Sequence, residues 1–508
     1  MIKKIDEYSN KTLGIPLPDL ILRSGRAVAE CLRSHVKSGA KVTILAGSGN
    51  NGGDGYALAS LIRDEYDLTV FDVFGKMQEG YAGRVFLEKY AADGGRIEKL
   101  NISPETLGFI RDSDCIVDAV FGTGFEGAMP EGLSELIACV NSSTRAYKIA
   151  IDVPLGVNAD DGSISEAYAC SVDTTVALSF VKPGLVSYPA RSFVGRIVYD
   201  DIGLPIDKLK SEFSFRFELV DKKLAASFLP RRDENGSKGS FGKLLIVCGS
   251  ERYRGAAHLA VEAALRGGVG YVTYVGPASL SEELRAKFPE VIYHSFDSLD
   301  ITAADVEKIA ALSSSHTATL VGSGSSVTDG LSMLVRRLIA EEGSPLILDA
   351  DAINSLAENK EQSCELLSHS PRTVVLTPHP LEFSRLFGSP VASVQSRRIE
   401  TALDFARRTG TVLVLKGAGT IVTDGDKVYI NSTGSSALSK AGSGDVLAGF
   451  LAAQVASSGC VLTAAALSVY YHGEAADILA DELSVFGVTP SDLPREIARR
   501  IAKSTALD

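Results

Sequence analysis

The sequence predicts an α/β protein that consists of two domains. Its 508 residues exceed what one hydrophobic core usually covers. Short apolar runs alternate with amphipathic segments along most of the chain, which is typical of parallel strands connected by helices. The pattern is interrupted at residues 205–242, where a charged stretch and a Gly/Ser-rich run occur, and then starts again. We therefore expect a boundary near residues 212–218, with domains over residues 1–212 and 216–508.

The first half begins with amphipathic helices over residues 1–40, interrupted near Gly14 and Pro16. A strand at residues 41–46 then runs into a glycine-rich loop and a helix at 56–63. Further strands are expected at residues 68–74, 115–120, 147–153 and 174–180, with helices at 80–92 and 131–141. This alternation predicts a parallel sheet with helices on both faces.

The second half repeats the alternation without repeating the local sequence. Strands are expected at residues 243–248, 271–275, 318–322, 345–349, 373–377, 411–415 and 420–423. Helices are expected at residues 255–266, 329–342, 395–409, 445–456 and 461–481. The two halves share a strand, a Gly-rich turn and a helix at their start, but they are not a sequence repeat.

Composition favours a small-molecule enzyme. A net charge of −12 and a pI near 5.3 argue against nucleic acid and anionic membranes as partners. The seven cysteines occur singly, without Cys-x-x-Cys, so neither a disulfide framework nor a thiolate zinc site is indicated. The charged N-terminus has no apolar core of a signal peptide, and no long apolar run follows, so we expect a cytoplasmic protein. We also expect a homo-oligomer, although the sequence does not fix the oligomeric state.

The stretch from Gly442 to Asp445 is the strongest chemical signal. Glycines precede a helix whose apolar positions recur every three to four residues, so Asp445 lies in the first helical turn. Free N–H groups of that turn can hold a phosphate, and Asp445 can take a proton from a substrate hydroxyl. Next to a helix N-terminus, the Asp445 pKa should be low. The alternative is an ordinary helix start with an acidic first turn.

Residues Gly47 to Gly52 match G-x-G-x-x-G, and Asp72 lies near where a ribose-binding acid is expected, so a dehydrogenase is the first hypothesis. However, Asn51 and Asp54 crowd this loop. A carboxylate there repels a pyrophosphate, whereas amide and carboxylate oxygens suit a hard cation and sugar hydroxyls. We therefore expect a cation and substrate site.

Other polar residues follow expected strands. Asp118 and Asp152 lie where carboxyl ends of parallel strands bring them towards Asn51 and Asp54. In the second half, Asp349 and Asp351 face the same side if the chain is extended and offer a divalent cation site by way of water. Lys416 can contact nucleotide phosphate, and the prolines around His379 hold it rigidly. Each of these, taken alone, is more simply explained by turn chemistry or solvation, and their joint occurrence favours a site.

Taken in order, these stretches resemble the bifunctional NAD(P)H-hydrate repair enzymes, in which an epimerase is fused to an ADP-dependent (S)-NAD(P)H-hydrate dehydratase. The resemblance covers nearly the whole chain. It implies a Rossmann-like three-layer epimerase domain over residues 1–212 and a ribokinase-like dehydratase domain over residues 216–508. The motifs that carry it are 49–55, 118–124, 152–154, 349–354, 377–380, 416–420 and 442–445.

The resemblance also implies roles for individual residues, with Asp445 and Asp152 as the catalytic ones. In the epimerase, the hydrated nucleotide contacts Asn50, Asn51, Gly52, Gly53, Asp54, Gly122, Thr123, Gly124, Phe125, Glu126, Gly127, Ala128 and Asp152. In the dehydratase, the hydrate contacts Ala256, Gly324, His379 and Asp445, and ADP contacts Lys416, Gly417, Ala418, Gly419, Thr420 and Gly444.

Two metal ions are implied as well. Potassium is expected at Asn51, Asp118 and position 155, and magnesium is expected to bridge the transferred phosphate. Relatives usually carry serine at position 155, but this chain has Leu155, which leaves only a backbone carbonyl as a ligand. The stretch from Leu20 to Gly25 also lacks a Met-Glu pair that is usual in relatives.

Two alternatives stay open at this point. A ribokinase-like small-molecule kinase fused to a nucleotide-binding domain shares residues 442–445 but releases a stable phosphorylated product. A non-catalytic nucleotide sensor keeps the phosphate site without needing Asp445 as a base.

Overall fold

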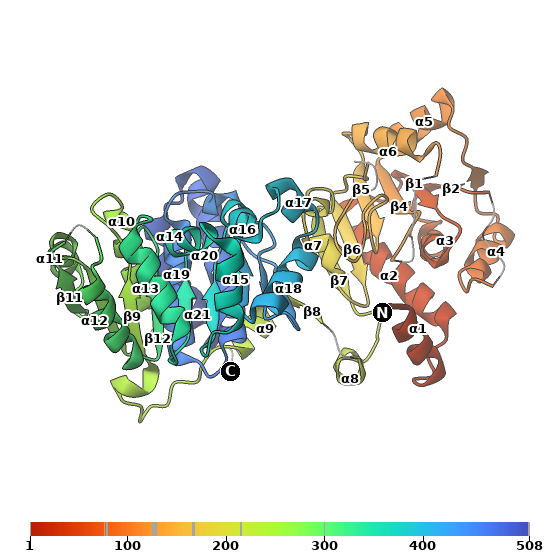
Figure 1. Ribbon diagram of the computed structural model, residues 1–508. Coiled ribbons are helices and arrows are strands. Elements are labelled where there is room, and N and C mark those ends of the chain that lie inside the picture. The colour runs from red at the N-terminus through yellow and green to blue at the C-terminus, as the bar shows by residue number, and fades with distance from the viewer. Residues whose placement is uncertain are drawn as a thin grey trace. The chain divides into compact units, whose positions relative to one another are not determined.

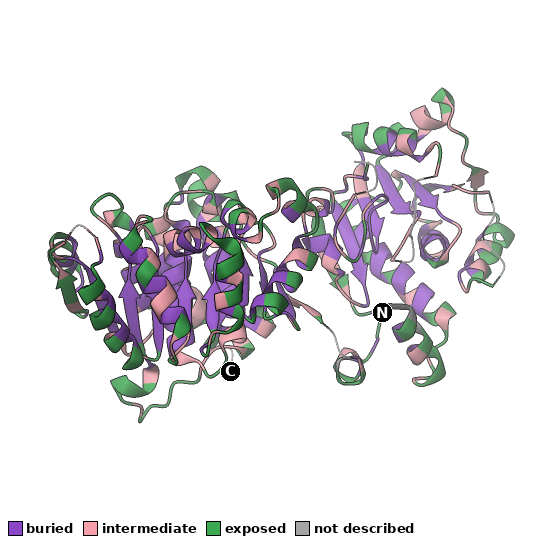
Figure 2. Cartoon of the chain, viewed as in Figure 1, coloured by how far each residue is buried: buried purple, intermediate pink, exposed green. Residues whose placement is uncertain are grey.

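The computed structural model describes residues 2–75, 77, 80–123, 130–164, 168–213, 216–298 and 300–505. The chain divides into two compact units, residues 1–215 and residues 216–508 (Figure 1). Each unit is built around one sheet whose central strands are buried, while the outer sides of the helices are exposed (Figure 2). The α/β fold class predicted from the sequence is confirmed.

The first unit has a seven-stranded, fully parallel sheet in the order β3-β2-β1-β4-β5-β6-β7. The strands are β1 Lys41–Ala46, β2 Asp67–Asp72, β3 Ile97–Lys99, β4 Cys115–Ala119, β5 Tyr147–Ile151, β6 Thr174–Leu178 and β7 Arg196–Asp200. The helices are α1 Ile2–Lys11, α2 Leu17–His35, α3 Asn50–Ile62, α4 Arg84–Ala92, α5 Pro104–Arg111, α6 Leu133–Ser142, α7 Pro183–Val186 and α8 Ile206–Glu212.

Helices cover both faces of this sheet. One apolar cluster joins the sheet to α2, α3 and α4, and a second cluster joins its other face to α5 and α6. Alternate residues of β1 serve the two clusters, because Ile44 belongs to the first and Leu45 to the second. The three-layer arrangement expected for this unit is therefore present.

The second unit has a ten-stranded sheet in the order β11-β10-β9-β12-β13-β14-β15-β16-β17-β8, in which β16 is antiparallel to both neighbours and the other pairs are parallel. The strands are β8 Phe217–Val220, β9 Lys243–Val247, β10 Tyr271–Pro277, β11 Ile292–Phe296, β12 Ala318–Val321, β13 Leu346–Leu348, β14 Val374–Leu376, β15 Val412–Leu415, β16 Ile421–Thr423 and β17 Val428–Asn431. The helices are α9 Lys222–Ser227, α10 Arg254–Arg266, α11 Ala278–Lys287, α12 Ala303–Ser314, α13 Asp329–Ala340, α14 Asp351–Ala357, α15 Lys360–Ser368, α16 Pro380–Phe387, α17 Val391–Ser396, α18 Arg398–Thr409, α19 Ser443–Ser457, α20 Val461–Gly487 and α21 Leu493–Thr505.

The start of α3 differs from the prediction. Residues 50–55, expected to be a loop, form the first turns of the helix. A Cβ on Gly52 would lie 1.9 Å from the Gly47 carbonyl oxygen, and one on Gly53 would lie 2.4 Å from Gly83 Cα. These glycines let the helix pack closely against neighbouring backbone, and the polar residues on either side of them, Asn51 and Asp54, consequently lie on the first turns of a helix.

The central strands agree with the predicted ranges, but β3, β7, β8, β11 and β17 were not predicted. β11 and β7 lie at the edges of their sheets and carry several exposed or half-exposed residues. Such strands need less apolar sequence than central ones. Among the described helices, none is long and apolar enough to cross a membrane.

We propose that the boundary between independently folding domains lies between residues 213 and 216. Phe213 packs edge-on against Tyr8 of the first unit, whereas β8 pairs with β17 in the second. Fragments 1–213 and 216–508 should therefore each give a monodisperse, cooperatively unfolding protein in size-exclusion and thermal-melting experiments. Aggregation of both fragments alongside a well-behaved full chain would place the boundary elsewhere.

Candidate active sites

The N-terminus of α19 lies where the sequence predicted a phosphate site. Gly442 precedes it with φ of 103°, and a Cβ there would lie 2.6 Å from Leu259 Cδ1, so the position requires glycine. Further along, Gly449 packs against the Ala260 carbonyl oxygen of α10. No side chain at Gly442 caps the first turn, and Asp445 lies in that turn, as predicted.

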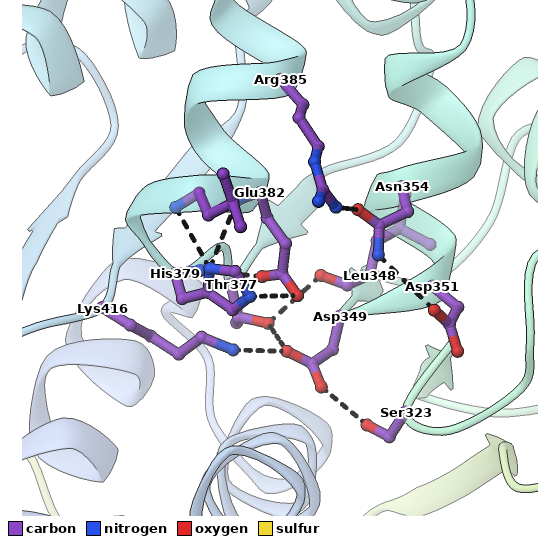
Figure 3. A network of polar contacts seen from close by, with 11 residues as sticks. Ser323, Leu348, Asp349, Asp351, Asn354, Thr377, His379, Glu382, Arg385 and Lys416 are labelled. Atoms are coloured by element: carbon purple, nitrogen blue, oxygen red, sulfur yellow. Dashed lines mark hydrogen bonds and ion pairs between the residues drawn. The ribbon is translucent and has the colours of Figure 1, made fainter. Parts of the chain in front are cut away.

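Asp349 lies at the centre of a polar network to which Ser323, Thr377 and Lys416 belong (Figure 3). It follows β13 and is only 1% exposed. Its Oδ2 accepts a hydrogen bond from Ser323 at 2.8 Å, and its Oδ1 accepts from Thr377 at 2.7 Å and from Lys416 Nζ at 2.9 Å. Three strand ends, those of β12, β14 and β15, thus supply donors to one carboxylate.

Lys416 also lies beside the expected phosphate site. Its Nζ is 3.4 Å from the position of a Cβ on Gly444, so the two predicted nucleotide residues are neighbours. Burial opposes the charged form, but the negative charges of Asp349 and Glu382 outweigh it and raise the pKa of Lys416. Lys416 therefore carries a positive charge next to the start of α19.

The Asp445 pKa corrects the prediction. Burial, followed by the charge of Asp349, raises the Asp445 pKa to about 7, although Lys416 acts in the opposite direction. The prediction of a low pKa considered only the helix terminus. It left out burial and the charges of residues that are distant in the sequence but close in the folded unit. Near neutral pH, this carboxyl group can both hold and release a proton, as a general base must.

The predicted pairing of Asp349 and Asp351 is wrong. Ala350 has φ of 47°, so the chain is not extended there, and Asp351 begins α14. Asp351 accepts from the Ser326 N–H at 2.9 Å and from Asn354, which in turn accepts from Arg385 at 3.0 Å (Figure 3). Among the described residues, no group of three or more metal-binding side chains occurs.

His379 caps α16. Its Nδ1 accepts from the N–H groups of Leu381 and Glu382 at 3.2 Å, while Glu382 accepts from the His379 N–H at 2.8 Å. A helix cap is therefore enough to explain why the His379 backbone lies where it does. The His379 ring is 46% exposed. Glu382 is a buried member of the site that the sequence analysis did not select.

The other predicted residues of the second unit fall into two groups. A Cβ on Gly324 would lie 2.6 Å from Ala256 Cβ, so these two residues are in contact. Residues 416–420 form the turn between β15 and β16, in which Thr420 donates to the Gly417 carbonyl at 2.7 Å. The Arg398 guanidinium stabilises this turn by donating a hydrogen bond to the Lys416 carbonyl at 3.3 Å. Ala418 is exposed at the tip of the turn, and Gly419 follows it with φ of 62°.

In the first unit, the start of α3 meets the end of β4. Asn51 Nδ2 donates to the Phe121 carbonyl at 2.9 Å, and Gly122 lies beside Asn51. Asp118 accepts from the N–H groups of Val120 at 3.1 Å and Leu155 at 2.6 Å. Burial raises the Asp118 pKa to about 6 against the effect of these two bonds. Asn51 thus contacts the loop that follows β4, and Asp118 near the end of β4 accepts from the chain at Leu155. A potassium ion shared by Asn51 and Asp118 stays a prediction.

Leu155 takes part differently from the prediction. Its carbonyl, expected to be free for potassium, accepts from the Cys170 N–H at 2.8 Å. Its side chain is fully buried in the apolar cluster with α5 and α6. Asn51 and Asp118 provide oxygen atoms that fit a hard cation, but Leu155 provides no side-chain ligand.

Asp152 forms a buried ion pair that the sequence analysis missed. It lies just after β5 with φ of 68°, and its side chain is 13% exposed. Lys182, whose side chain is 5% exposed, pairs with it and donates to the Leu178 carbonyl at 2.6 Å. The sequence contains one sign of this ion pair, which is the lysine between Val181 and Gly184 just after β6. Taken alone, a lysine at that place is equally typical of an ordinary surface turn.

The remaining predicted residues of the first unit are only partly described. Asp54 is buried and Asn50 is exposed on the first turns of α3, and Thr123 is half-buried. Gly124, Phe125, Glu126, Gly127 and Ala128 lie outside the described residues. Asp72, the ribose-binding candidate of the dehydrogenase hypothesis, accepts instead from the Gly75 N–H at 2.9 Å and closes a turn.

The arrangement of strands and helices in the second unit is the ribokinase-like fold, as comparison with solved structures shows. That unit resembles a ribokinase-like superfamily protein of Enterococcus faecalis V583, with a TM-score of 0.51, 22% identity, and coverage of 57% of this chain and 98% of the other. It also resembles the hypothetical protein SMU.573 of Streptococcus mutans, with a TM-score of 0.50, 26% identity, and coverage of 57% and 100%.

Sequence comparison then gives the family. Residues 244–499 match the family described as NAD(P)H-hydrate dehydratase, and residues 18–184 match the YjeF-related protein N-terminus. The bifunctional NAD(P)H-hydrate repair enzyme of Moorella thermoacetica is 33% identical over 96% of this chain and 93% of its own. The enzyme of the same name from Escherichia coli is 31% identical over 97% and 91%. The chain belongs to the family of bifunctional NAD(P)H-hydrate repair enzymes.

The buried ion pair gives a stability prediction. Lys182→Met should lower the free energy of unfolding by about 3–5 kcal/mol, because it leaves the Asp152 charge buried without its partner. The double variant Asp152→Leu/Lys182→Met should recover much of that loss, since no charge then remains. Urea unfolding of the full chain measures both. Equal stability of the single and double variants would show that the pair is not coupled.

Proposed function

We propose that this chain repairs hydrated NADH and NADPH. The first unit interconverts the R and S epimers of the hydrate, and the second unit dehydrates the S form while ADP is converted to AMP and phosphate. Membership of the family supports both activities, and the residues 1–215 and 216–508 would act as epimerase and dehydratase. The cytoplasmic location and the homo-oligomeric state stay predictions.

The observation that carries the dehydratase is that Asp445 lies in the uncapped first turn of α19, where it interacts electrostatically with the Lys416 ammonium. The Asp445 carboxylate would take the proton of the C6 hydroxyl, whose oxygen then attacks the terminal phosphorus of ADP as the bond to AMP breaks. Cleavage of the C–O bond then expels this phosphate, and loss of a proton from C5 forms the double bond that restores the reduced nicotinamide ring. The N-terminus of α19 and Lys416 would stabilise the negative charge on the transferred group.

Magnesium would be held by ADP phosphates together with carboxylates of this site. This ion usually keeps several waters and takes one or two carboxylates in addition to substrate phosphates. Asp349 is already occupied by Ser323, Thr377 and Lys416. The half-exposed Asp351 therefore fits such a role better, through water. When bound, the metal would neutralise charge that develops on the phosphates.

In the first unit, Asp152 and Lys182 would carry or position the proton-transfer groups of epimerisation. Asn51, Asp54 and the turn at Gly122 would bind the hydrated nucleotide. Potassium would be held loosely at Asn51 and Asp118, because Leu155 supplies no side-chain oxygen.

The direct test is incubation of the purified chain with hydrated NADH, ADP and magnesium. Recovery of reduced-nicotinamide absorbance from both epimers, with AMP and phosphate as products, is the expected result. Accumulation of a stable phosphorylated compound would instead identify a small-molecule kinase. Binding of nucleotide without turnover would identify a sensor.

Substitution of Asp445 tests the base. Asp445→Asn should reduce dehydration by on the order of 10² or more, the scale of a general base, while epimerisation is unchanged. The matched control is Asp329→Asn, which removes an exposed acid from the first turn of α13, outside this site, and should leave dehydration unchanged. Dehydration by Asp445→Asn within a few fold of the unsubstituted enzyme would remove Asp445 from the mechanism.

The pH dependence follows from the raised Asp445 pKa. A base must be deprotonated, so kcat for dehydration should fall as the pH drops below an apparent pKa near 7. Lys416 lowers the Asp445 pKa, so Lys416→Met should move the midpoint to higher pH as well as weaken ADP binding. A midpoint that stays in place or moves to lower pH in Lys416→Met contradicts this electrostatic coupling.

Position 155 tests the potassium site. Leu155→Ala should cost about 2–5 kcal/mol of stability, because it empties a fully buried position. Leu155→Ser makes a similar cavity but adds a hydroxyl ligand. Replacing sodium by potassium should therefore raise the melting temperature and the epimerisation rate more in the Ser variant than in the Ala variant. An identical potassium response in the two variants would show that position 155 has no influence on the ion.

A further inference from the structure

Arg398 is a buried charged residue that takes no part in the proposed chemistry. It opens α18, and it is only 2% exposed. Burial opposes a charge, and the N-terminus of a helix is the end at which a positive charge is least favourable. An apolar side chain of similar volume would fill this place at lower cost. The hydrogen bonds of the guanidinium, rather than its bulk, therefore distinguish arginine at this position from an apolar residue.

The guanidinium of Arg398 binds the end of β15. Its Nη2 donates to the carbonyl of Leu415 at 3.1 Å and to that of Lys416 at 3.3 Å, and its Nη1 donates to Gln395 Oε1 at 2.5 Å. A Cβ on Gly417, whose φ is 138°, would lie 3.0 Å from both Nη atoms. Glycine at this position therefore lets the guanidinium come close to the turn that follows β15.

These bonds fix one end of the Lys416 backbone. At the other end, the Lys416 N–H donates to the Pro378 carbonyl at 2.9 Å. The tip of the turn has a hydrogen bond of its own, from Thr420 to the Gly417 carbonyl at 2.7 Å. Arg398 therefore acts on Lys416 more directly than on the residues that follow it.

The Lys416 ammonium depends on this backbone position for its reach. Its Nζ atom donates to Asp349 at 2.9 Å and lies 3.4 Å from the position of a Cβ on Gly444. A misplacement of about 1 Å, caused by a substitution far from the reacting atoms, can cost on the order of 10²-fold in rate. Loss of the Arg398 bonds should therefore change how Lys416 meets a ligand.

We propose that Arg398 is a positioning residue of the nucleotide site, which holds the Lys416 ammonium in place through the Leu415 and Lys416 carbonyls. It acts through Lys416 and not through a contact of its own with the nucleotide. The inference rests on the proposed function for the identity of the ligand, ADP. It adds to the site a residue that lies 18 positions away from Lys416 in the sequence.

Calorimetric titration of the full chain with ADP, in a double-mutant cycle, tests the proposal. Arg398→Met should weaken ADP binding by about 3- to 30-fold, within the range expected for coupling through a hydrogen-bonded network. In a Lys416→Met chain, which lacks the ammonium, the additional change Arg398→Met should alter the ADP affinity by less than about 2-fold. Equal losses in the two backgrounds, or no loss in either, overturn the proposal.

The matched control is Arg372, a second buried arginine of this unit, which is 7% exposed. Its guanidinium donates to two backbone carbonyls, at 2.9 and 3.0 Å, and lies against a glycine, Gly343. Arg372 precedes β14, at the opposite edge of the sheet from Lys416. Arg372→Met should therefore change the ADP affinity by less than about 2-fold. A loss as large as that in Arg398→Met would show a general effect of destabilisation and overturn the proposal.

If Arg398→Met does not fold, Arg398→Lys gives the same comparison, because it keeps the charge but replaces the planar fork with a compact ammonium. The readout does not depend on turnover. An ADP affinity that falls only while Lys416 is present, in a chain that fails to restore hydrated NADH, would refute the proposed function and leave this inference intact. Unchanged ADP affinity in the Arg398 variants of a chain that repairs the hydrate would do the opposite.

Discussion

The ion pair between Lys416 and Asp349 determines the electrostatics of the second unit. Both groups are largely removed from water, and a buried charge is tolerated only when it is paired and hydrogen-bonded. Asp349 receives donors from Ser323, Thr377 and Lys416, so both of its carboxylate oxygens are hydrogen-bonded. Lys416 is thereby held next to Gly444, where the phosphate of a nucleotide would bind.

The same pair adjusts the pKa of Asp445. Burial raises this pKa most, the negative charge of Asp349 raises it further, and the positive charge of Lys416 lowers it. The balance leaves a base that exchanges its proton near neutral pH rather than a permanently ionised first-turn acid. The first unit also contains a buried ion pair, between Asp152 after β5 and Lys182 after β6. In both units, parallel strands bring these charged groups to the carboxyl edge of the sheet.

Local sequence patterns were sufficient to predict the central strands of both sheets and the helix that carries Asp445. The apolar runs located the central strands, and the glycines before Val446 correctly placed Asp445 in a first helical turn. The Asp445 pKa was not predictable, because Asp349 and Lys416 come from other strands and no local pattern reveals their distance. The glycines of residues 52 and 53 were assigned to a loop, since their close contacts with Gly47 and Gly83 exist only in the folded unit. The partnership of Lys182 with Asp152 was not predictable for the same reason, because the two residues are 30 positions apart and meet only in the folded unit.

The fate of the hydroxyl oxygen tests the central claim most directly. If Asp445 activates the C6 hydroxyl and that oxygen attacks ADP, the later C–O cleavage leaves the oxygen in phosphate. Hydrated NADH labelled with heavy oxygen at C6 should therefore give labelled inorganic phosphate in an amount equal to the NADH recovered, as measured by mass spectrometry. Label that appears in water, with unlabelled phosphate, would show that no phosphoryl transfer to the hydroxyl takes place and would contradict the account.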